Sequence, residues 1–407
     1  MRYRKPNLLC YRVAQVVSFA VAKLIFKRRI IRNEIKGLKG PFVVIANHQA
    51  AYDFVNLINT TSRRMSFVIS NSFYETLPIK KILDKIGVIP KQQFQTTVKD
   101  MRDMKAVIDS GNPLVIYPAG LMCEDGLSTP IPSATYKFLK WLGADVYVAR
   151  SFGTYFVMPK WSKGMRAGNT HLDIYKLFSK EELKNSSEAK IKEKAEKALL
   201  FDAYREQEEI KALYKNGANI EGLENVLYFC PVCKKEFTIE VKNKNTIYCT
   251  HCGFEQQSDK YSFMHLAGSV GKEIRYVSDW SRLIYNDLKE KLIRTPNTVL
   301  EAQTVIEMIN PEKHRFEKVG EGNITLTKAG FTLRGEISGE KTEIFTSINQ
   351  IPTLPFSPGN YFEIQNGDII YRLRLKDAKL IMKFINTVKA FYEIKTKETV
   401  KLHEREL

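Results

Sequence analysis

Short apolar runs alternate with longer helical stretches between residues 36 and 178. Each run has four or five residues, is rich in β-branched side chains and is bounded by turn-forming or polar residues; the runs occupy residues 42–46, 66–70, 114–117 and 145–149. Continuous apolar runs of this length are typical of strands buried on both faces. The stretch 99–110 between two runs has helical periodicity. The pattern predicts an α/β fold in which helices flank a largely parallel sheet.

The second half of the chain predicts three further segments. Residues 179–222 are rich in Glu, Lys and Ala and indicate a polar-faced helical connector, and residues 257–319 a helical linker region. From residue 320 two hairpins with clear turn signals precede apolar positions at helical spacing. Residues 320–407 thus predict a small β-barrel with a C-terminal helix. This topology resembles the pleckstrin-homology or GRAM-type lipid-binding fold, although a packing or protein-contact module fits equally well.

The first 35 residues combine an apolar stretch with dense positive charge. Residues 1–40 hold eleven of the 63 Lys and Arg residues against one acidic residue, and the whole chain has a formal net charge of +18. The apolar run 8–26 is interrupted by Arg12, Gln15 and Lys23, whereas a spanning helix needs ~20 predominantly apolar residues. We expect residues 1–35 to form a basic amphipathic helix on an anionic membrane surface. A helix packed on the protein and a single membrane span are the alternatives.

The composition excludes two broad classes of protein. With 44% hydrophobic and 11% aromatic residues the chain can build substantial cores, so it is not a disordered protein. Six cysteines in 407 residues are too few for a disulfide scaffold, and the N-terminus does not resemble a cleavable secretory signal. We expect a cytoplasmic protein, peripheral on the inner face of the cell membrane. Because the positive charge gathers around an apolar helix, we expect no nucleic-acid partner.

Four cysteines form the most specific pattern in the chain. Within residues 223–256 a C-x2-C-x15-C-x2-C spacing contains Cys230, Cys233, Cys249 and Cys252. Two such turns can face each other and hold a zinc ion with four thiolates in a closed tetrahedron, which leaves no open position for chemistry. We therefore predict a structural zinc ribbon. His251 could replace one cysteine as a ligand, and nucleic-acid contact is an alternative role for the ribbon.

The candidate catalytic residues directly follow the first buried run. His48 stands just beyond the carboxyl end of residues 42–46, where open α/β sheets place their sites, and Asp53 follows five residues later. The carboxylate can accept the Nδ1 proton of the imidazole and fix its tautomer, which leaves Nε2 free to remove a proton from a hydroxyl. A structural histidine or a metal ligand fits the same spacing.

The pair Asn47-His48, followed by Asp53, resembles the NHxxxxD motif of the phospholipid/glycerol acyltransferase family, which includes the lysophosphatidic acid acyltransferases. Segments resembling the second, third and fourth motifs of that family follow in order, at residues 86–91, 115–120 and 144–149. The resemblance implies that residues 36–178 form an acyltransferase domain. The connector and ribbon also resemble a bacterial subgroup in which this domain carries a zinc ribbon and a C-terminal module.

This resemblance implies a 1-acylglycerol-3-phosphate O-acyltransferase-like enzyme of phospholipid synthesis. A fatty acyl group would move from acyl-CoA or acyl carrier protein to a hydroxyl of glycerol phosphate or a lysophospholipid, with His48 as general base and Asp53 orienting it. Backbone N–H groups near Gly120 or just after His48 would stabilise the oxyanion. Lys91, standing where the family has Arg, and Arg150 would bind the phosphate of the acceptor.

The third motif departs from the family pattern. Ala119, Leu121 and Met122 stand where the family has Glu, Thr and Arg. Glu124 or Asp125, a few residues on, could supply a carboxylate instead. The missing Glu keeps open a second function, in which the protein is a non-catalytic lipid- or protein-binding scaffold that retains the acyltransferase fold.

Overall fold

The computed structural model of the protein describes residues 5–93 and 97–397. They form two compact units, residues 5–159 with Met165–Lys215, and Lys160–Gly164 with residues 216–397, and each is described by itself. Two basic residues of the predicted N-terminal segment, Arg2 and Arg4, lie outside the described residues, as do residues 398–407 of the predicted C-terminal module.

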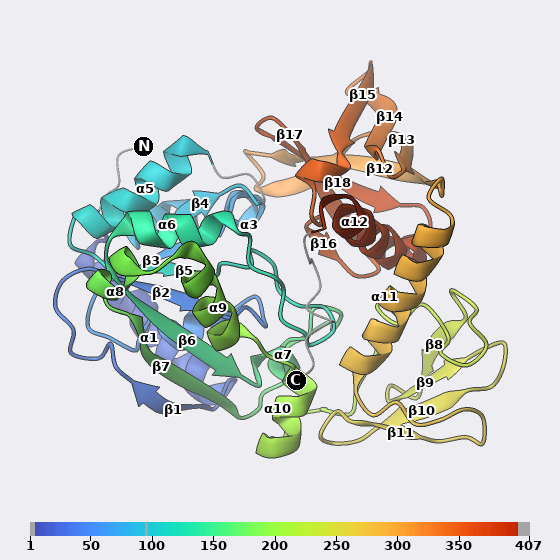
Figure 1. Cartoon of the computed structure of the whole chain (residues 1–407), viewed down its shortest axis with the longest axis horizontal. Helices are drawn as coiled ribbons and strands as arrows, with labels where there is room; N and C mark the ends of the chain where they lie inside the picture. Colours follow the sequence, from blue (N-terminus) through green and yellow to red (C-terminus); the bar gives the residue numbers. More distant parts are fainter. Residues whose placement is uncertain (1–4, 94–96, 398–407) are drawn as a thin grey trace. The chain divides into compact units, whose positions relative to one another are not determined.

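A seven-stranded mixed sheet organises the first unit (Figure 1), in the strand order β1-β7-β6-β2-β5-β3-β4. The strands are β1 (Arg28–Asn33), β2 (Phe42–Ala46), β3 (Ser66–Ser70), β4 (Ile89–Lys91), β5 (Leu114–Ile116), β6 (Asp145–Phe152) and β7 (Thr170–Phe178). The strands from β6 to β4 pair in parallel, β7 is antiparallel to β6, and β1 is parallel to β7. The four apolar runs are β2, β3, β5 and β6, so the prediction of an α/β fold with a largely parallel sheet is confirmed.

Helices cover both faces of this sheet because successive residues of a strand point to opposite sides. In β2, Val43 and Ile45 join a core with residues of α5, α6 and α9, whereas Phe42 and Val44 join a core with residues of α1 and α2. The helices of this unit are α1 (Leu8–Leu24), α2 (Asp53–Leu57), α3 (Asn71–Thr76), α4 (Lys80–Lys85), α5 (Val98–Asp109), α6 (Ala134–Leu142), α7 (Thr154–Val157), α8 (Lys180–Asn185), α9 (Glu188–Leu199) and α10 (Ala203–Ile210). The last three lie within residues 179–222, the segment predicted as a connector.

Helix α1 packs on the unit through a face that is largely polar. Its buried residues are Tyr11, Gln15, Ser18 and Ala22. The Tyr11 hydroxyl accepts a hydrogen bond from the backbone N–H of Met65 at 2.8 Å. The Gln15 amide donates to the backbone oxygens of Ile58 at 2.8 Å and Thr61 at 3.0 Å. Specific hydrogen bonds therefore anchor this face of the helix.

The opposite face of α1 is apolar and exposed. Leu9, Val16 and Leu24 keep 74%, 70% and 70% of their surface exposed. The other large apolar residues on this face are Leu8, Val13, Val17 and Phe19, each more than half exposed. The usual arrangement of an amphipathic helix on a soluble protein is thus reversed, since the polar residues face the protein. No helix within the described part of the chain is long and apolar enough to span a bilayer.

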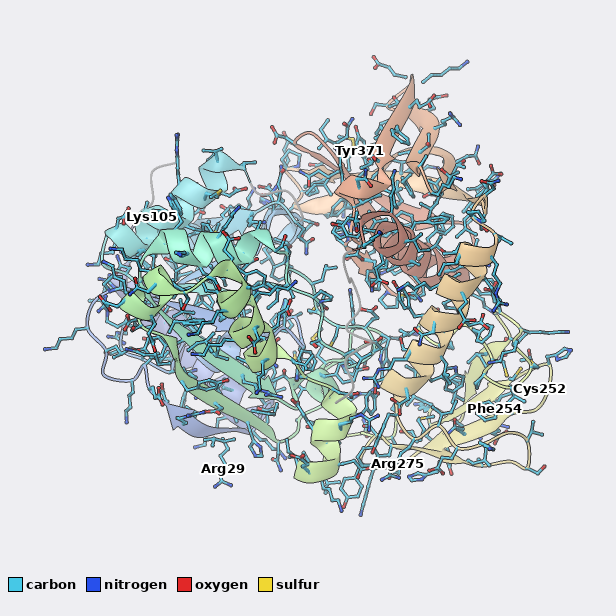
Figure 2. All side chains as sticks on the ribbon, viewed as in Figure 1. Arg29, Lys105, Cys252, Phe254, Arg275 and Tyr371 are labelled. Atoms are coloured by element: carbon cyan, nitrogen blue, oxygen red, sulfur yellow. The ribbon has the colours of Figure 1, made fainter. Side chains whose placement is uncertain are left out.

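The prediction of one helix over residues 1–35 is wrong beyond Leu24. Residues Arg28–Asn33 form the edge strand β1, which pairs with β7. The β-branched pair Ile30 and Ile31 favours a strand, and Arg29 projects away from the sheet edge (Figure 2). Charged side chains on an edge strand prevent further strand pairing, so the basic residues after α1 protect the end of the sheet.

The second unit contains two antiparallel sheets. The smaller has the order β11-β10-β9-β8. Its strands are β8 (Ile239–Lys242), β9 (Thr246–Cys249), β10 (Glu255–Ser258) and β11 (Met264–Leu266). The larger has the order β15-β14-β13-β12-β18-β17-β16. Its strands are β12 (Leu300–Asn310), β13 (Arg315–Leu326), β14 (Gly330–Ile337), β15 (Glu340–Ser347), β16 (Phe356–Ser357), β17 (Tyr361–Asn366) and β18 (Ile369–Leu375).

The C-terminal helix is present, and the larger sheet extends further than predicted. Helix α12 (Ile381–Thr396) packs on the sheet, with the Phe384 ring stacked 6.1 Å from that of Phe362. The recorded pairings leave β15 and β16 as edges, so a closed barrel is not confirmed. The expected helical linker 257–319 contains helix α11 (Val277–Arg294), but also β11, β12 and the start of β13. Only Thr304 and Ile306 of β12 are buried, so its sequence carried a weak apolar signal.

Replacing Tyr11 by Phe tests how α1 is anchored. Tyr11→Phe leaves the buried N–H of Met65 without its acceptor, which typically costs about 1–3 kcal/mol. We expect a lower urea midpoint by circular dichroism. The control is Tyr248→Phe, which removes only an exposed hydroxyl bonded to Glu240 and should change the midpoint little. Equal midpoints for the two variants would mean that the Tyr11 hydroxyl does not anchor the helix.

Candidate functional site

The loop that follows β2 is tied to the neighbouring strand β6. The strand register pairs Ala46 with Ala149. Just beyond this pair, the buried Asn47 amide donates to the backbone oxygen of Ser151 at 2.8 Å and accepts from the Ser151 N–H at 2.8 Å. The side chain thus continues the strand pairing as a backbone amide would. These bonds fix the backbone just before His48 at the carboxyl edge of the sheet.

The structure brings His48 and Asp53 together. Nδ1 of His48 lies 3.0 Å from Oδ2 of Asp53, and the same oxygen accepts the backbone N–H groups of Gln49 at 2.8 Å and Ala50 at 2.9 Å. Because a carboxylate oxygen can only accept, Nδ1 carries the proton and Nε2 keeps its lone pair. The Asp53 side chain is 1% exposed and that of His48 is 20% exposed, so only the imidazole is accessible to a substrate.

The same geometry overturns one expectation about the oxyanion. The N–H groups of Gln49 and Ala50 already donate to Asp53, so the expectation that groups just after His48 stabilise an oxyanion is wrong. Gly120 lies in the turn after β5, and its N–H donates to the backbone oxygen of Tyr117 at 3.0 Å. Gly120 has φ +70°, and a Cβ added there would meet nothing within 4 Å. Its predicted role in substrate binding stays a prediction.

Tyr117 and Cys123 lie close to His48 and to the residue that follows it, Gln49. The Tyr117 ring lies 4.6 Å from the imidazole of His48, and burial, with a contribution from the Asp53 charge, raises the pKa of Tyr117. Burial also raises the pKa of the Cys123 thiol, and Asp125, Glu124 and Asp53 add to the effect. The thiol therefore stays protonated at neutral pH, which disfavours a cysteine nucleophile.

Arg150, the predicted phosphate-binding residue at the end of β6, is held by a carboxylate that the sequence did not single out. Its Nη2 donates to Oε1 of Glu206 at 2.7 Å, and its guanidinium lies 4.9 Å from the Phe152 ring. Burial raises the pKa of Glu206 to about 7, although the charge and hydrogen bond of Arg150 and the amide of Gln49 oppose the rise. Nothing in the Glu-rich connector distinguishes Glu206 by sequence, because only folding shows which of these acids is buried.

Of the remaining predicted residues of this unit, Lys91 lies apart from the pair, because it ends β4, which is separated from β2 by β5 and β3. Its Nζ donates to the backbone oxygen of Gln92 at 3.0 Å, and burial lowers the pKa of its amine. Glu124 and Asp125 are both buried, and Asp125 accepts from the backbone N–H of Leu127 at 3.1 Å. A role for Lys91 in phosphate binding stays a prediction.

In the second unit, the four predicted cysteines gather at one point. Their sulfur atoms all lie within 4.8 Å of one another; the residues are Cys230, Cys233, Cys249 and Cys252. The two C-x2-C segments form the same turn. The Lys234 N–H donates to the backbone oxygen of Cys230, and the Gly253 N–H donates to that of Cys249, both at 3.1 Å. Cys252 and Phe254 lie at one end of this ribbon (Figure 2). Such a cluster can hold a metal ion.

The chain resembles known proteins over part of its length. The similar solved structures include the 1-acyl-sn-glycerophosphate (LPA) acyltransferase PlsC from Thermotoga maritima, with 17% identity, 49% of this chain and 79% of that chain covered, and a TM-score of 0.41. They also include the Ran-binding domain of Nup2 from Ashbya gossypii, with 12% identity, 24% of this chain and 99% of that chain covered, and a TM-score of 0.20. Scores this low carry no argument about function. No curated protein matches the chain.

A family model matches the segment that carries the predicted catalytic pair, His48 and Asp53. Residues 26–162 match the model described as Acyltransferase. The match begins at the end of α1, includes β1 to β6 and α7, and contains both His48 and Asp53. Residues 26–162 therefore form a domain of the Acyltransferase family.

Proposed function

We propose that the protein is a membrane-associated acyltransferase that moves a fatty acyl group from acyl-CoA or acyl carrier protein to a hydroxyl of glycerol phosphate or a lysophospholipid. The observation that carries this proposal is the contact between His48 and Asp53 inside the acyltransferase domain, 3.0 Å apart at the carboxyl edge of the sheet. A lysophospholipid such as 1-acylglycerol 3-phosphate is the acceptor that the resemblance to the family implies.

In the proposed reaction, Nε2 of His48 accepts the proton of the acceptor hydroxyl as its oxygen attacks the thioester carbonyl. The imidazolium that forms is stabilised by Asp53, whose carboxylate is held by two backbone N–H groups and cannot turn away. The tetrahedral intermediate collapses with cleavage of the carbon–sulfur bond, and the leaving thiolate takes the proton from Nε2. The products are the ester and a free thiol, and no covalent enzyme intermediate is needed.

Replacing the proposed base tests this mechanism. His48→Ala should lower acyl transfer from acyl-CoA to lysophosphatidic acid by roughly 10²–10⁴-fold, the usual contribution of a general base. The matched control is His265→Ala, which removes an exposed imidazole of the second unit and should retain wild-type activity. Wild-type activity in His48→Ala would reject the proposed base. A wild-type protein without any transferase activity would instead favour the scaffold function, which the Ala119 substitution also supports.

We further propose that the exposed face of α1 binds an anionic membrane. Seven large apolar side chains on this face are exposed to water, Lys23 lies in the last turn of the helix, and the exposed residues Lys27 and Arg29 follow it. Burial of the apolar face in the lipid interface favours binding, and each nearby cation adds about 1 kcal/mol against an anionic leaflet. Charge and an apolar face together support a peripheral location on the inner, cytoplasmic face of the cell membrane.

Point substitutions test this surface better than a deletion, because Tyr11 is buried in the core and β1 pairs with β7. The double variant Leu9→Ser/Val16→Ser should bind vesicles containing phosphatidylglycerol at least tenfold more weakly in sedimentation, since burial of each side chain is worth about 1.5–3 kcal/mol. The control Val232→Ser removes an apolar side chain that is 40% exposed in the ribbon and should bind like the wild type. Undiminished binding by the double variant would remove α1 from the proposal.

We propose that zinc is the metal of the cysteine cluster. The Sγ–Sγ distances of 3.6 Å for Cys230–Cys252 and 3.7 Å for Cys233–Cys249 are close to the edge of about 3.8 Å that a tetrahedron with Zn–S bonds of ~2.3 Å requires. Four thiolates fill the coordination shell, so the ion would stabilise the ribbon and take no part in acyl transfer.

Metal analysis of the purified protein tests the zinc assignment. We expect close to one zinc per chain in the wild type, and none in the double variant Cys230→Ser/Cys249→Ser, which removes two of the four ligands. Cys10→Ser, on α1, should keep the metal. A wild type without zinc, or zinc retained in the double variant, would contradict the assignment.

A further inference from the structure

A buried carboxylate from outside the acyltransferase segment binds Arg150, the arginine predicted to hold the acceptor phosphate. Glu206 lies on α10, in the connector, whereas the family match ends at residue 162. Its side chain is only 13% exposed. Burying a carboxylate is costly unless partners of suitable charge and geometry compensate, so its contacts indicate why this position carries Glu.

The guanidinium of Arg150 is the hydrogen-bond partner of Glu206. The bond from Nη2 to Oε1 at 2.7 Å is charge-assisted, and such bonds are stronger and more directional than neutral ones. Arg150 stands one residue after Ala149, which pairs with Ala46 at the end of β2, so it lies at the same sheet edge as His48. An arginine that is held on one side by a carboxylate can still present its remaining N–H groups to a phosphate.

Gln49, the residue after His48, is fixed by other groups. Its Oε1 accepts from the Thr154 hydroxyl at 3.0 Å and from the N–H of Tyr155 at 3.2 Å, and its backbone N–H donates to Asp53 at 2.8 Å. Nε2 of Gln49 and Oε2 of Glu206 are both buried without a hydrogen-bond partner. The hydrogen bond that holds Glu206 is therefore the one to Arg150.

We propose that Glu206 is a positioning residue of the active site, whose carboxylate fixes Arg150 as the cation for the acceptor phosphate. This inference rests on the proposed function. Glu206 acts through its neighbours and does not itself contact the reacting atoms.

Steady-state kinetics at pH 8 test this role. Glu206→Gln keeps the size of the side chain but loses the charge-assisted bond to Arg150. We expect KM for lysophosphatidic acid to rise about tenfold, while kcat and KM for acyl-CoA stay within about twofold of the wild type. Glu206→Asp, which retains the charge on a shorter side chain, should give a smaller rise. The matched control is Glu209→Gln, an exposed acid on the same helix, which should behave as the wild type.

The outcomes separate positioning from simple stabilisation. An unchanged KM for lysophosphatidic acid in Glu206→Gln overturns the inference. A lower kcat together with a rise in both KM values and a lower urea midpoint also overturns it, because a purely structural residue behaves in this way. If the wild type transfers no acyl group, the proposed function fails, and calorimetric binding of glycerol 3-phosphate then decides. Weaker binding by Glu206→Gln than by wild type and Glu209→Gln supports the positioning role, and equal binding overturns it.

Discussion

The candidate active site depends on one buried oxygen, Oδ2 of Asp53. It accepts three hydrogen bonds, from the imidazole of His48 and from the backbone N–H groups of Gln49 and Ala50. These bonds compensate for burying a carboxylate that is 1% exposed, and they fold the loop of residues 47–52, between β2 and α2, around it. The same bonds fix the tautomer of His48, so the structure of the loop and the proposed chemistry have one physical cause.

The loop is held on its other side by contacts that reach across the sheet. Asn47 bridges to Ser151 of β6, and Gln49 is fastened to Thr154 and Tyr155 at the start of α7. Together these polar side chains connect β2 to the next strand and helix without regular backbone pairing. The catalytic histidine is therefore supported by rigid elements, which is what a base with a defined direction needs.

Much of this arrangement could be predicted because it depends on local patterns. Buried strands such as Phe42–Ala46 are continuous apolar runs, and His48 and Asp53 are separated by a single turn. The spacing of the cysteines likewise predicts that they meet. Glu206 could not be found in this way, because its importance comes from its contact with Arg150, which is distant in sequence.

Helix α1 shows a different limit of sequence reasoning. Its periodicity predicts an amphipathic helix, but not which face meets the protein. The hydrogen bonds of Tyr11 and Gln15 decide this, and they turn the polar face inward. The strand β1 was missed because Ile30 and Ile31 stand among arginines and resemble the end of a basic helix. Strand pairing with β7, which is distant in sequence, overrides that local resemblance.

The account depends on which ring nitrogen of His48 carries the proton. Nitrogen NMR of the full chain with labelled histidine reads this directly at a pH at which the imidazole is neutral. The His48 signal is assigned by its loss in the alanine variant. The structure requires a neutral ring protonated at Nδ1, with Nε2 bare, and a change of tautomer balance in Asp53→Asn. A ring protonated at Nε2 in the wild type would mean that Asp53 does not accept its proton, and His48 could not act as the base.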